Sequence, residues 1–299
     1  MKILISGASG LVGTALAQAL RARGHEPVPL VRPPAPAPPG QVRWNPETGE
    51  LDLAAAAGAG AVVNLAGASI AAGRWTEARK RLLWSSRVDA TQSLIAALSR
   101  LSPPPAVFIS ASAVGYYGDR GDELLTEASA PGKDFLAQLA QNWEAAAQQA
   151  AQHGMRTVIL RFGMVLAPHG GALARMLPPF RFGLGGPLGS GRQWVSWIAL
   201  EDAVGIITQA LEHAEWGGVY NAVAPEPVRN RDFARALGHV LGRPAALPVP
   251  AVALRLLFGE LADALLLASQ RVIPQRLQAV GYQYAYNDLT MALAAMLKR

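Results

Sequence analysis

The sequence predicts an α/β protein with a doubly wound parallel sheet and a smaller appended lobe. Three observations support this prediction. Short apolar segments that favour strands alternate with amphipathic helical segments, and several of these strands are apolar throughout, as in a sheet buried on both faces. A glycine-rich turn joins the first strand to the first helix. The 299 residues, 51% hydrophobic and 16% charged, are enough for one α/β domain and a smaller lobe.

The N-terminal half alternates strands with helices along the chain. Short apolar runs predict strands at 2–6, 26–31, 61–65, 106–111 and 157–162. Amphipathic or alanine-rich segments predict helices at 11–23, 52–60, 76–100 and 135–151. The segment Pro33–Gly40 is expected to be a surface loop, because proline lacks the N–H that helices and strand ladders need.

The regular alternation breaks past about residue 165. The Gly/Pro-rich segment 178–191 is expected to be a loop with short elements. After it, the pattern predicts a helix at 200–213, a strand at 219–223, a helix at 231–241 and a mostly helical tail. We therefore expect a first domain over 1–165, to which 195–223 returns, and a C-terminal lobe formed mostly by 166–299.

Composition excludes several classes of protein. The chain has no cysteine, which excludes disulfides, thiolate metal sites and a cysteine nucleophile and is compatible with a reducing cytoplasm. The five histidines are dispersed without ligand spacing, so no metal site is expected. No apolar stretch is long enough to span a membrane, and we expect a soluble, cytoplasmic protein. The net charge of +6 comes mainly from scattered arginines without interleaved aromatics, which favours a small anionic ligand over nucleic acid.

The glycine loop predicts a dinucleotide site. Between the first strand and the first helix the chain reads Gly7-Ala8-Ser9-Gly10-Leu11-Val12-Gly13. In such loops the first glycine allows the tight turn, the middle one lets the backbone approach a pyrophosphate, and the last lets the helix pack closely on the strand. The N-terminus of the helix then offers free N–H groups to the phosphates. The predicted cofactor contacts here are Gly7, Ser9, Gly10, Leu11, Val12 and Gly13.

Arg32 indicates which dinucleotide is bound. It ends the second strand, about twenty residues past the glycines, where NAD-selective proteins of this kind carry an acid for the ribose 2′-hydroxyl. No Asp or Glu lies between Glu26 and Glu47. An arginine there can instead pair with a 2′-phosphate, so NADP(H) is the predicted cofactor. The alternative is a solvated arginine at a strand end.

Further motifs resemble a known family. Asn64-Leu65-Ala66-Gly67 follows one predicted strand and Ser110-Ala111-Ser112 the next. Together with the glycine loop, they resemble the extended short-chain dehydrogenase/reductase superfamily, and in particular its atypical, epimerase-like branch with an extra C-terminal region. Further matches are Ser112–Gly118, Asn142–Glu144, Arg161–Gly163, Trp194–Ile198 with Asp202, Tyr220-Asn221 and Gln270–Val272 with Pro274.

That resemblance implies a Rossmann-type cofactor domain with a smaller α+β substrate lobe over the nicotinamide end. Ligands of such open sheets bind at the carboxyl ends of the strands. The resemblance adds to the expected cofactor contacts the matching residues Asn64, Leu65, Ala66, Gly67, Ser110 and Arg161.

The catalytic pattern of typical members is incomplete. They use a serine with a tyrosine and, four residues later, a lysine that assists proton transfer. Ser112 matches the serine, but Leu136 and Ala140 align with the tyrosine and the lysine.

Possible substitutes for the missing pair are Tyr116, Tyr117 and Arg87. Arg87 stands where the usual asparagine of the long helix would be, and it could hold a carbonyl or an anionic substrate. The alternatives are packed loop aromatics for the tyrosines and a solvated helix face for Arg87. Glu144 either anchors its helix or faces the cleft as a base.

Two functions follow from this sequence. The first is an NADP(H)-dependent oxidoreductase or epimerase-like enzyme that acts on a small hydroxyl or carbonyl substrate. The second is a catalytically lapsed NADP(H)-binding sensor or scaffold, as the loss of tyrosine and lysine would allow. We expect a small-molecule substrate, no nucleic-acid or membrane partner, and a possible homodimer through the helices at 76–100 and 135–151.

Overall fold

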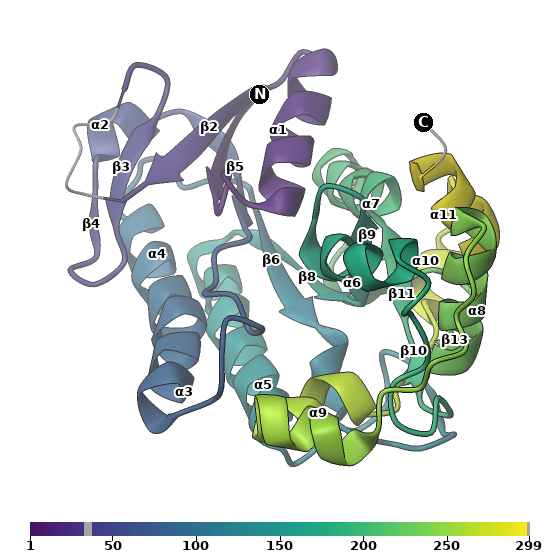
Figure 1. The fold of residues 1–299 in the computed structure, drawn as a ribbon. Coiled ribbons are helices and arrows are strands. Elements are labelled where there is room, and N and C mark those ends of the chain that lie inside the picture. The colour runs from purple at the N-terminus through teal and green to yellow at the C-terminus, as the bar shows by residue number, and fades with distance from the viewer. Residues whose placement is uncertain (33–37, 298–299) are drawn as a thin grey trace.

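A mostly parallel sheet of eight strands forms the centre of the computed structural model, which describes residues 1–32 and 38–297 (Figure 1). Most of the predicted Pro33–Gly40 loop lies outside the described residues. In spatial order the strands are β12 (Gly218–Ala222), β8 (Arg156–Phe162), β6 (Val107–Ala113), β5 (Ala59–Asn64), β1 (Lys2–Ser6), β2 (Glu26–Val31), β3 (Val42–Asn45) and β4 (Glu50–Leu51). Among the described strands of this sheet, only β3 and β4 pair in the antiparallel direction. The predicted doubly wound α/β fold is confirmed, and the edge strands β3 and β4 are additions that the sequence analysis missed.

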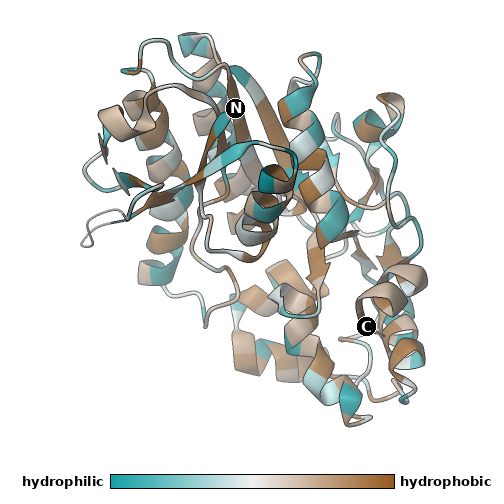
Figure 2. Cartoon of the chain, turned by 90° about the horizontal axis from the view of Figure 1, so that it is seen from above, coloured by the Kyte–Doolittle hydropathy of each residue, from teal (hydrophilic) through white to brown (hydrophobic). Residues whose placement is uncertain are grey.

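Each face of the sheet packs against its own set of helices. On β1, Ile3 and Ile5 point into one core and Leu4 into the other, because successive strand residues face opposite sides. The first core includes residues of α1 (Leu11–Ala22) and α7 (Leu200–Glu212). The second lies under α2 (Leu53–Ala56), α4 (Ala90–Leu98) and α5 (Phe135–Gln148), which continues as a 3-10 turn over Gln149–His153. Figure 2 shows the central strands mainly in the hydrophobic colour.

The long helix expected at 76–100 is present in three consecutive segments. These are α3 (Glu77–Trp84), a π-helical turn (Ser85–Asp89) and α4. The π turn was not predicted from sequence, because it leaves the apolar periodicity nearly unchanged. Such turns are rare and are frequently found at functional sites. This one carries Arg87.

The C-terminal part of the chain forms α6 (Gly171–Arg181), α8 (Asn230–Leu241), α9 (Ala251–Phe258), α10 (Gln275–Ala279) and α11 (Leu289–Leu297). The loop prediction was wrong at its start, since α6 runs through Pro178 and Pro179. Both prolines are exposed, whereas Leu177 and Phe180 are buried in a core shared with α8. Burial of this apolar face outweighs the helix hydrogen bonds that the prolines cannot make.

Short two-stranded pairings lie outside the central sheet. They join β9 (Met164–Ala167) to β11 (Trp197–Ala199), β10 (Trp194–Val195) to β13 (Val228–Arg229) and β7 (Leu124–Leu125) to β14 (Arg271–Val272). In the part of the chain that the structure describes, no helix combines the length and the apolar character that a membrane crossing requires.

Candidate functional site

The glycine loop lies at the N-terminus of α1, where Gly7 and Gly13 cannot be replaced without a clash. Gly7 has a φ of +70°, and a Cβ there would approach the carbonyl carbon of Leu65 to 2.8 Å. A Cβ on Gly13 would lie 2.3 Å from the Gly7 carbonyl oxygen. Gly10 begins the helix with no side-chain cap, and the first turn carries no acid. The first N–H groups of α1 are therefore available to an anion.

The loop after β5 is held against the glycine loop by Ser6. The Ser6 hydroxyl donates to Asn64 Oδ1 at 2.6 Å and accepts from the N–H groups of Leu65 and Ala66 at 3.2 Å each. The Asn64 amide in turn donates to Thr91 Oγ1 at 2.8 Å. Asn64 therefore positions this loop with its side chain, and the backbone of Leu65 and Ala66 lies beside Gly7. The sequence analysis did not single out Ser6, although a polar residue ending an apolar strand was the available signal.

The other predicted cofactor residues differ in their exposure. Ser9 and Arg32 are exposed, and Arg32 directly follows β2 without an ion pair to any residue in the described ranges. Leu11 and Val12 are half-buried, with Leu11 packed against the backbone at Gly170. Ser110 is fully buried inside β6, so the segment expected to follow the strand is part of it.

Ser112 belongs to a buried polar network at the end of β6. Its hydroxyl donates to Glu144 Oε1 at 2.6 Å. Arg161 of β8 donates to the same carboxylate twice, through Nε to Oε1 and through Nη2 to Oε2, each at 2.7 Å. All three side chains are at least nine-tenths buried. Arg161 was predicted as a cofactor contact, but its guanidinium is committed to this ion pair.

The two tyrosines after β6 have different environments. Tyr117 is fully buried, and its hydroxyl donates to Asn221 Oδ1 at 2.7 Å and accepts from Arg161 at 2.9 Å. Burial raises the pKa of Tyr117 to about 12. This enclosed hydroxyl does not meet the expectation of a cleft proton donor. Tyr116 is half-buried against the Arg161 guanidinium, whose carbon lies 3.4 Å from the ring centroid.

Arg87 is buried, so the alternative of a solvated helix face is wrong. Its Nη2 donates to the Ala68 carbonyl at 3.0 Å, and its guanidinium packs against Gly67 and lies 5.3 Å from the Trp143 ring centroid. Burial, followed by repulsion from Arg79, lowers the pKa of Arg87 to about 10.

The positions aligned with the missing pair hold no proton-transfer group. Leu136 and Ala140 are both buried in α5, and Leu136 packs with Trp143 in an apolar cluster.

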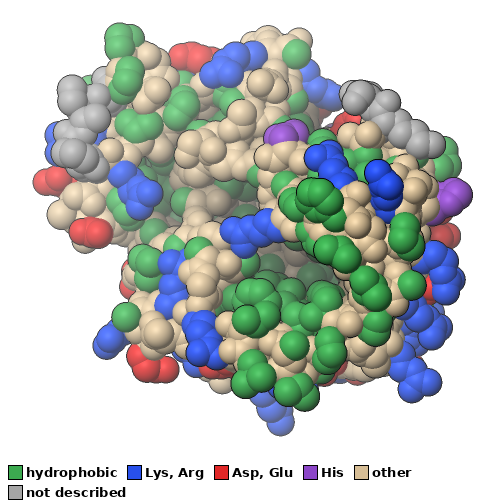
Figure 3. Space-filling view, in the orientation of Figure 1, with side chains coloured by type: hydrophobic (Ala, Val, Ile, Leu, Met, Phe, Trp, Pro, Cys, Tyr) green, Lys and Arg blue, Asp and Glu red, His purple; other side chains and the backbone are tan. Residues whose placement is uncertain are grey.

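Figure 3 shows the surface hollowed between the part over β2 to β5 and the part over α6 and α9, with Lys and Arg side chains on the rim. The carboxyl ends of β1, β5 and β6 thus bring together the glycine loop, the Asn64–Gly67 loop and Ser112.

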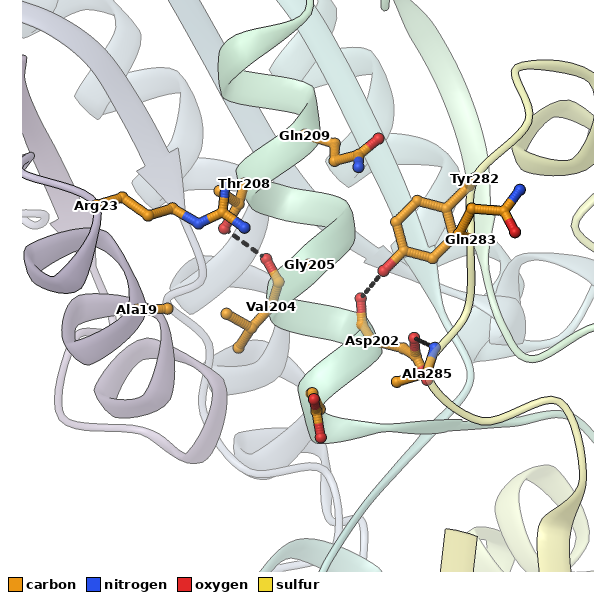
Figure 4. Close-up of a pocket in the computed structure, with 11 residues that line it drawn as sticks. Ala19, Arg23, Asp202, Val204, Gly205, Thr208, Gln209, Tyr282, Gln283 and Ala285 are labelled. Carbon is orange, nitrogen blue, oxygen red and sulfur yellow. Dashed lines mark hydrogen bonds between the residues drawn. The ribbon is translucent and has the colours of Figure 1, made fainter. Parts of the chain in front are cut away.

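A separate pocket of about 320 Å³ lies between α1, α7 and residues 282–285 (Figure 4). Asp202 supports it by accepting hydrogen bonds from the N–H groups of Ala285 at 2.7 Å and Tyr286 at 3.2 Å. The Tyr282 hydroxyl donates to the Asp202 carbonyl at 3.1 Å. Asp202 thus connects α7 to the C-terminal segment rather than capping its helix. The pocket shares no lining residue with the glycine-loop site.

Comparison with known proteins agrees with this geometry. Residues 3–222 match the model of the NAD dependent epimerase/dehydratase family, and residues 249–296 match a domain of unknown function, DUF1731. The chain is 46% identical over 291 residues to epimerase family protein Mb2239 of Mycobacterium bovis, covering 97% of this chain and 96% of that protein. It is 41% identical over 296 residues to human epimerase family protein SDR39U1, covering 98% of each.

Solved structures give the same result. The crystal structure of human epimerase family protein SDR39U1 (isoform 2) with NADPH superposes with a TM-score of 0.90 and 38% identity, covering 100% of both chains. The family model spans most of the chain, including the glycine loop, Ser112 and Arg161. The chain therefore belongs to the NAD dependent epimerase/dehydratase family.

Proposed function

We propose that the protein binds NADP(H) and uses it as an oxidoreductase or epimerase-like enzyme on a small substrate with a hydroxyl or carbonyl group. The observation that carries the proposal is the uncapped N-terminus of α1 behind Gly7 and Gly10, which suits a pyrophosphate. The NADPH in the crystal structure of the similar human protein supports it.

Arg32 supports NADP(H) over NAD(H). It is exposed at the end of β2, as a partner for a 2′-phosphate should be. The acids nearest to it in sequence, Glu26 and Glu47, lie at the far end of β2 and beyond β3. We therefore expect the 2′-phosphate to raise affinity for this site.

Ser112 is the group that we place against the substrate. Its hydroxyl proton is directed at Glu144, so Oγ keeps acceptor capacity for a substrate hydroxyl. The bound nicotinamide would accept or supply the hydride. During oxidation of an alcohol, Ser112 Oγ would accept the hydroxyl proton as its own proton passes to Glu144 Oε1, and reduction would reverse both transfers. Arg161 would hold the carboxylate in place for this exchange.

The first test is titration of the chain with NADPH and NADH. We expect Arg32→Glu to weaken NADPH binding by about tenfold or more, because a charge-assisted contact becomes a repulsion, and to leave NADH binding nearly unchanged. Arg21→Glu is the matched control, since Arg21 is exposed at the opposite end of α1. Equal affinity of the unmodified chain for both cofactors would contradict the NADP(H) assignment.

A screen of small carbonyl compounds, followed by NADPH oxidation, then tests the chemistry. We expect Ser112→Ala to reduce kcat by a hundredfold or so while NADPH affinity stays the same, as for loss of a general acid or base. A turnover that Ser112→Ala leaves unchanged would remove Ser112 from the mechanism.

A second candidate function is a sensor or scaffold that binds NADP(H) without turnover. The buried Leu136 and Ala140 favour it, because neither can replace the tyrosine or the lysine of typical members. Tight NADPH binding with no turnover across the carbonyl screen would support this candidate. Homodimerisation through the helices at 76–100 and 135–151 stays a prediction for either function.

A further inference from the structure

Arg161 and Arg87 are both buried, but only Arg161 has an acidic partner in the described structure. Arg161 is 3% exposed, and its charge is neutralised by Glu144 in a bidentate ion pair. Arg87 is 8% exposed and has no ion pair with any acid of residues 1–32 and 38–297. Burial of a charge is unfavourable unless a counter-charge accompanies it. Arg87 therefore lacks the compensation that Arg161 has.

Arg79 places a second positive charge beside Arg87. Arg87 Nη2 donates to the carbonyl of Ala68 at 3.0 Å, and Arg79 Nη2 donates to the next carbonyl, that of Ser69. The Nε of Arg79 is buried and has no hydrogen-bond partner in the described structure. Like Arg87, Arg79 forms no ion pair with a described acid. The two guanidinium groups thus donate to consecutive peptide carbonyls, and each keeps further N–H donors for another acceptor.

The pair lies at the end of β5, next to the loop that we assign to the cofactor. Arg87 packs against Gly67 and is carried by the π turn Ser85–Asp89. In the sheet, β5 lies between β1 and β6, the strand that carries Ser112, whereas β2 and Arg32 lie on the far side of β1. The pyrophosphate and the 2′-phosphate are assigned to α1 and Arg32, so neither calls for the Arg79–Arg87 pair.

We propose that Arg87 and Arg79 together bind an oxyanion group of the substrate, a carboxylate or a phosphate. The inference rests on the proposed function, since it assigns the substrate class of that site: small hydroxy or carbonyl compounds that carry an acid group. The planar guanidinium fork fits both oxyanions through paired hydrogen bonds. An incoming oxyanion supplies the counter-charge that the described chain does not.

The test is a titration of the full chain with oxalate and with inorganic phosphate, at constant ionic strength set by chloride. Binding is followed by the rise in melting temperature, with and without saturating NADPH. We expect Arg87→Gln and Arg79→Gln each to weaken oxyanion binding by about tenfold, and Arg87→Lys to weaken it less, because the charge remains without the fork. Arg81→Gln is the matched control, because it removes a charge from the exposed side of the same helix.

The outcomes separate this inference from the proposed function. A response to oxalate, phosphate or both that is lost in the two glutamine variants supports the inference and identifies the class of acid. An oxyanion response that is equal in all variants overturns it. If the glutamine variants lose NADPH affinity without any added oxyanion, the pair serves the cofactor, and the inference is overturned while the proposed function stands.

Two further controls keep the test decisive. If Arg87→Gln does not fold, Arg79→Gln decides the question alone, because Arg79 is partly exposed. If the chain binds no NADPH at all, the proposed function fails, and the titration without cofactor still decides whether the pair binds an oxyanion.

Discussion

Arg161 donates two hydrogen bonds of 2.7 Å to the carboxylate of Glu144, and both side chains are almost completely buried. Ser112 shares Oε1 of that carboxylate. The ion pair therefore connects β8 to α5 and sets the direction of the Ser112 hydroxyl. Removing one partner would leave a charge in the interior with no counter-charge.

The first prediction concerns Glu144→Gln. It leaves Arg161 buried without a counter-charge, and we expect it to lower the free energy of unfolding by about 3–5 kcal/mol. Urea denaturation measures this. Glu123→Gln is the control, because Glu123 pairs with Arg120 at the surface, where such pairs contribute at most about 1 kcal/mol. Equal losses in the two variants would contradict the importance of the buried pair.

The second prediction compares Gly7→Ala with Gly24→Ala. The two glycines have similar φ values of +70° and +75°, but the Cβ of Gly7 would meet Leu65 whereas that of Gly24 meets nothing within 4 Å. We expect Gly24→Ala to cost about 1–2 kcal/mol of stability from backbone strain alone, with NADPH affinity unchanged. Gly7→Ala should cost more and also abolish NADPH binding, because the two loops must move apart. Thermal unfolding and NADPH titration check both, and intact NADPH binding in Gly7→Ala would disprove the contact.

The third prediction concerns alkaline pH. The pKa of Tyr117 is raised to about 12 in the folded state, against about 10 for an exposed tyrosine. The unfolded chain then releases this proton at lower pH than the folded chain. The contribution of Tyr117 to the free energy of unfolding is therefore fully present below pH about 10 and is lost as pH rises toward 12. The loss from this group is on the order of 2 kcal/mol. Burial raises the pKa of Tyr282 and Tyr284 in the same direction.

Urea denaturation at stepped pH measures this dependence. Tyr117→Phe should make the stability loss shallower, although the variant starts from a lower stability because Asn221 and Arg161 each lose a partner. An identical slope in Tyr117→Phe would rule out Tyr117 as a source of the effect.

The fourth prediction concerns Asp202→Ala. Its carboxylate accepts the N–H groups of Ala285 and Tyr286 and so holds the C-terminal segment on α7. Loss of two hydrogen bonds to a charged, buried acceptor should cost about 3 kcal/mol or more. Asp232→Ala, at a partly exposed position of α8 where the carboxylate pairs with Arg235, should cost little by comparison. Hydrogen exchange should show faster exchange at 285–286 in Asp202→Ala alone, and unchanged exchange there would contradict this role.

The sequence by itself determined the features that depend on neighbouring residues. Apolar periodicity predicted the central strands and most helices, since it reports which face of each segment is buried. The glycine spacing predicted the tight turn before α1, because Gly7 and Gly13 are required by local backbone geometry. The position of Arg32 after β2 depended only on counting along the chain.

The tertiary structure alone decided which distant side chains meet. Ser112 and Glu144 are 32 residues apart and Glu144 and Arg161 are 17 apart, and no local preference pairs them. For Arg87 the sequence left open a role in holding a substrate and a place on a solvated helix face, and only the π turn and the loop at Gly67 show that it is buried. The burial of Leu177 and Phe180 outweighs the tendency of the two prolines in α6 to end the helix. Backbone conformation follows from local sterics, but burial and pairing depend on which surfaces the whole fold brings into contact.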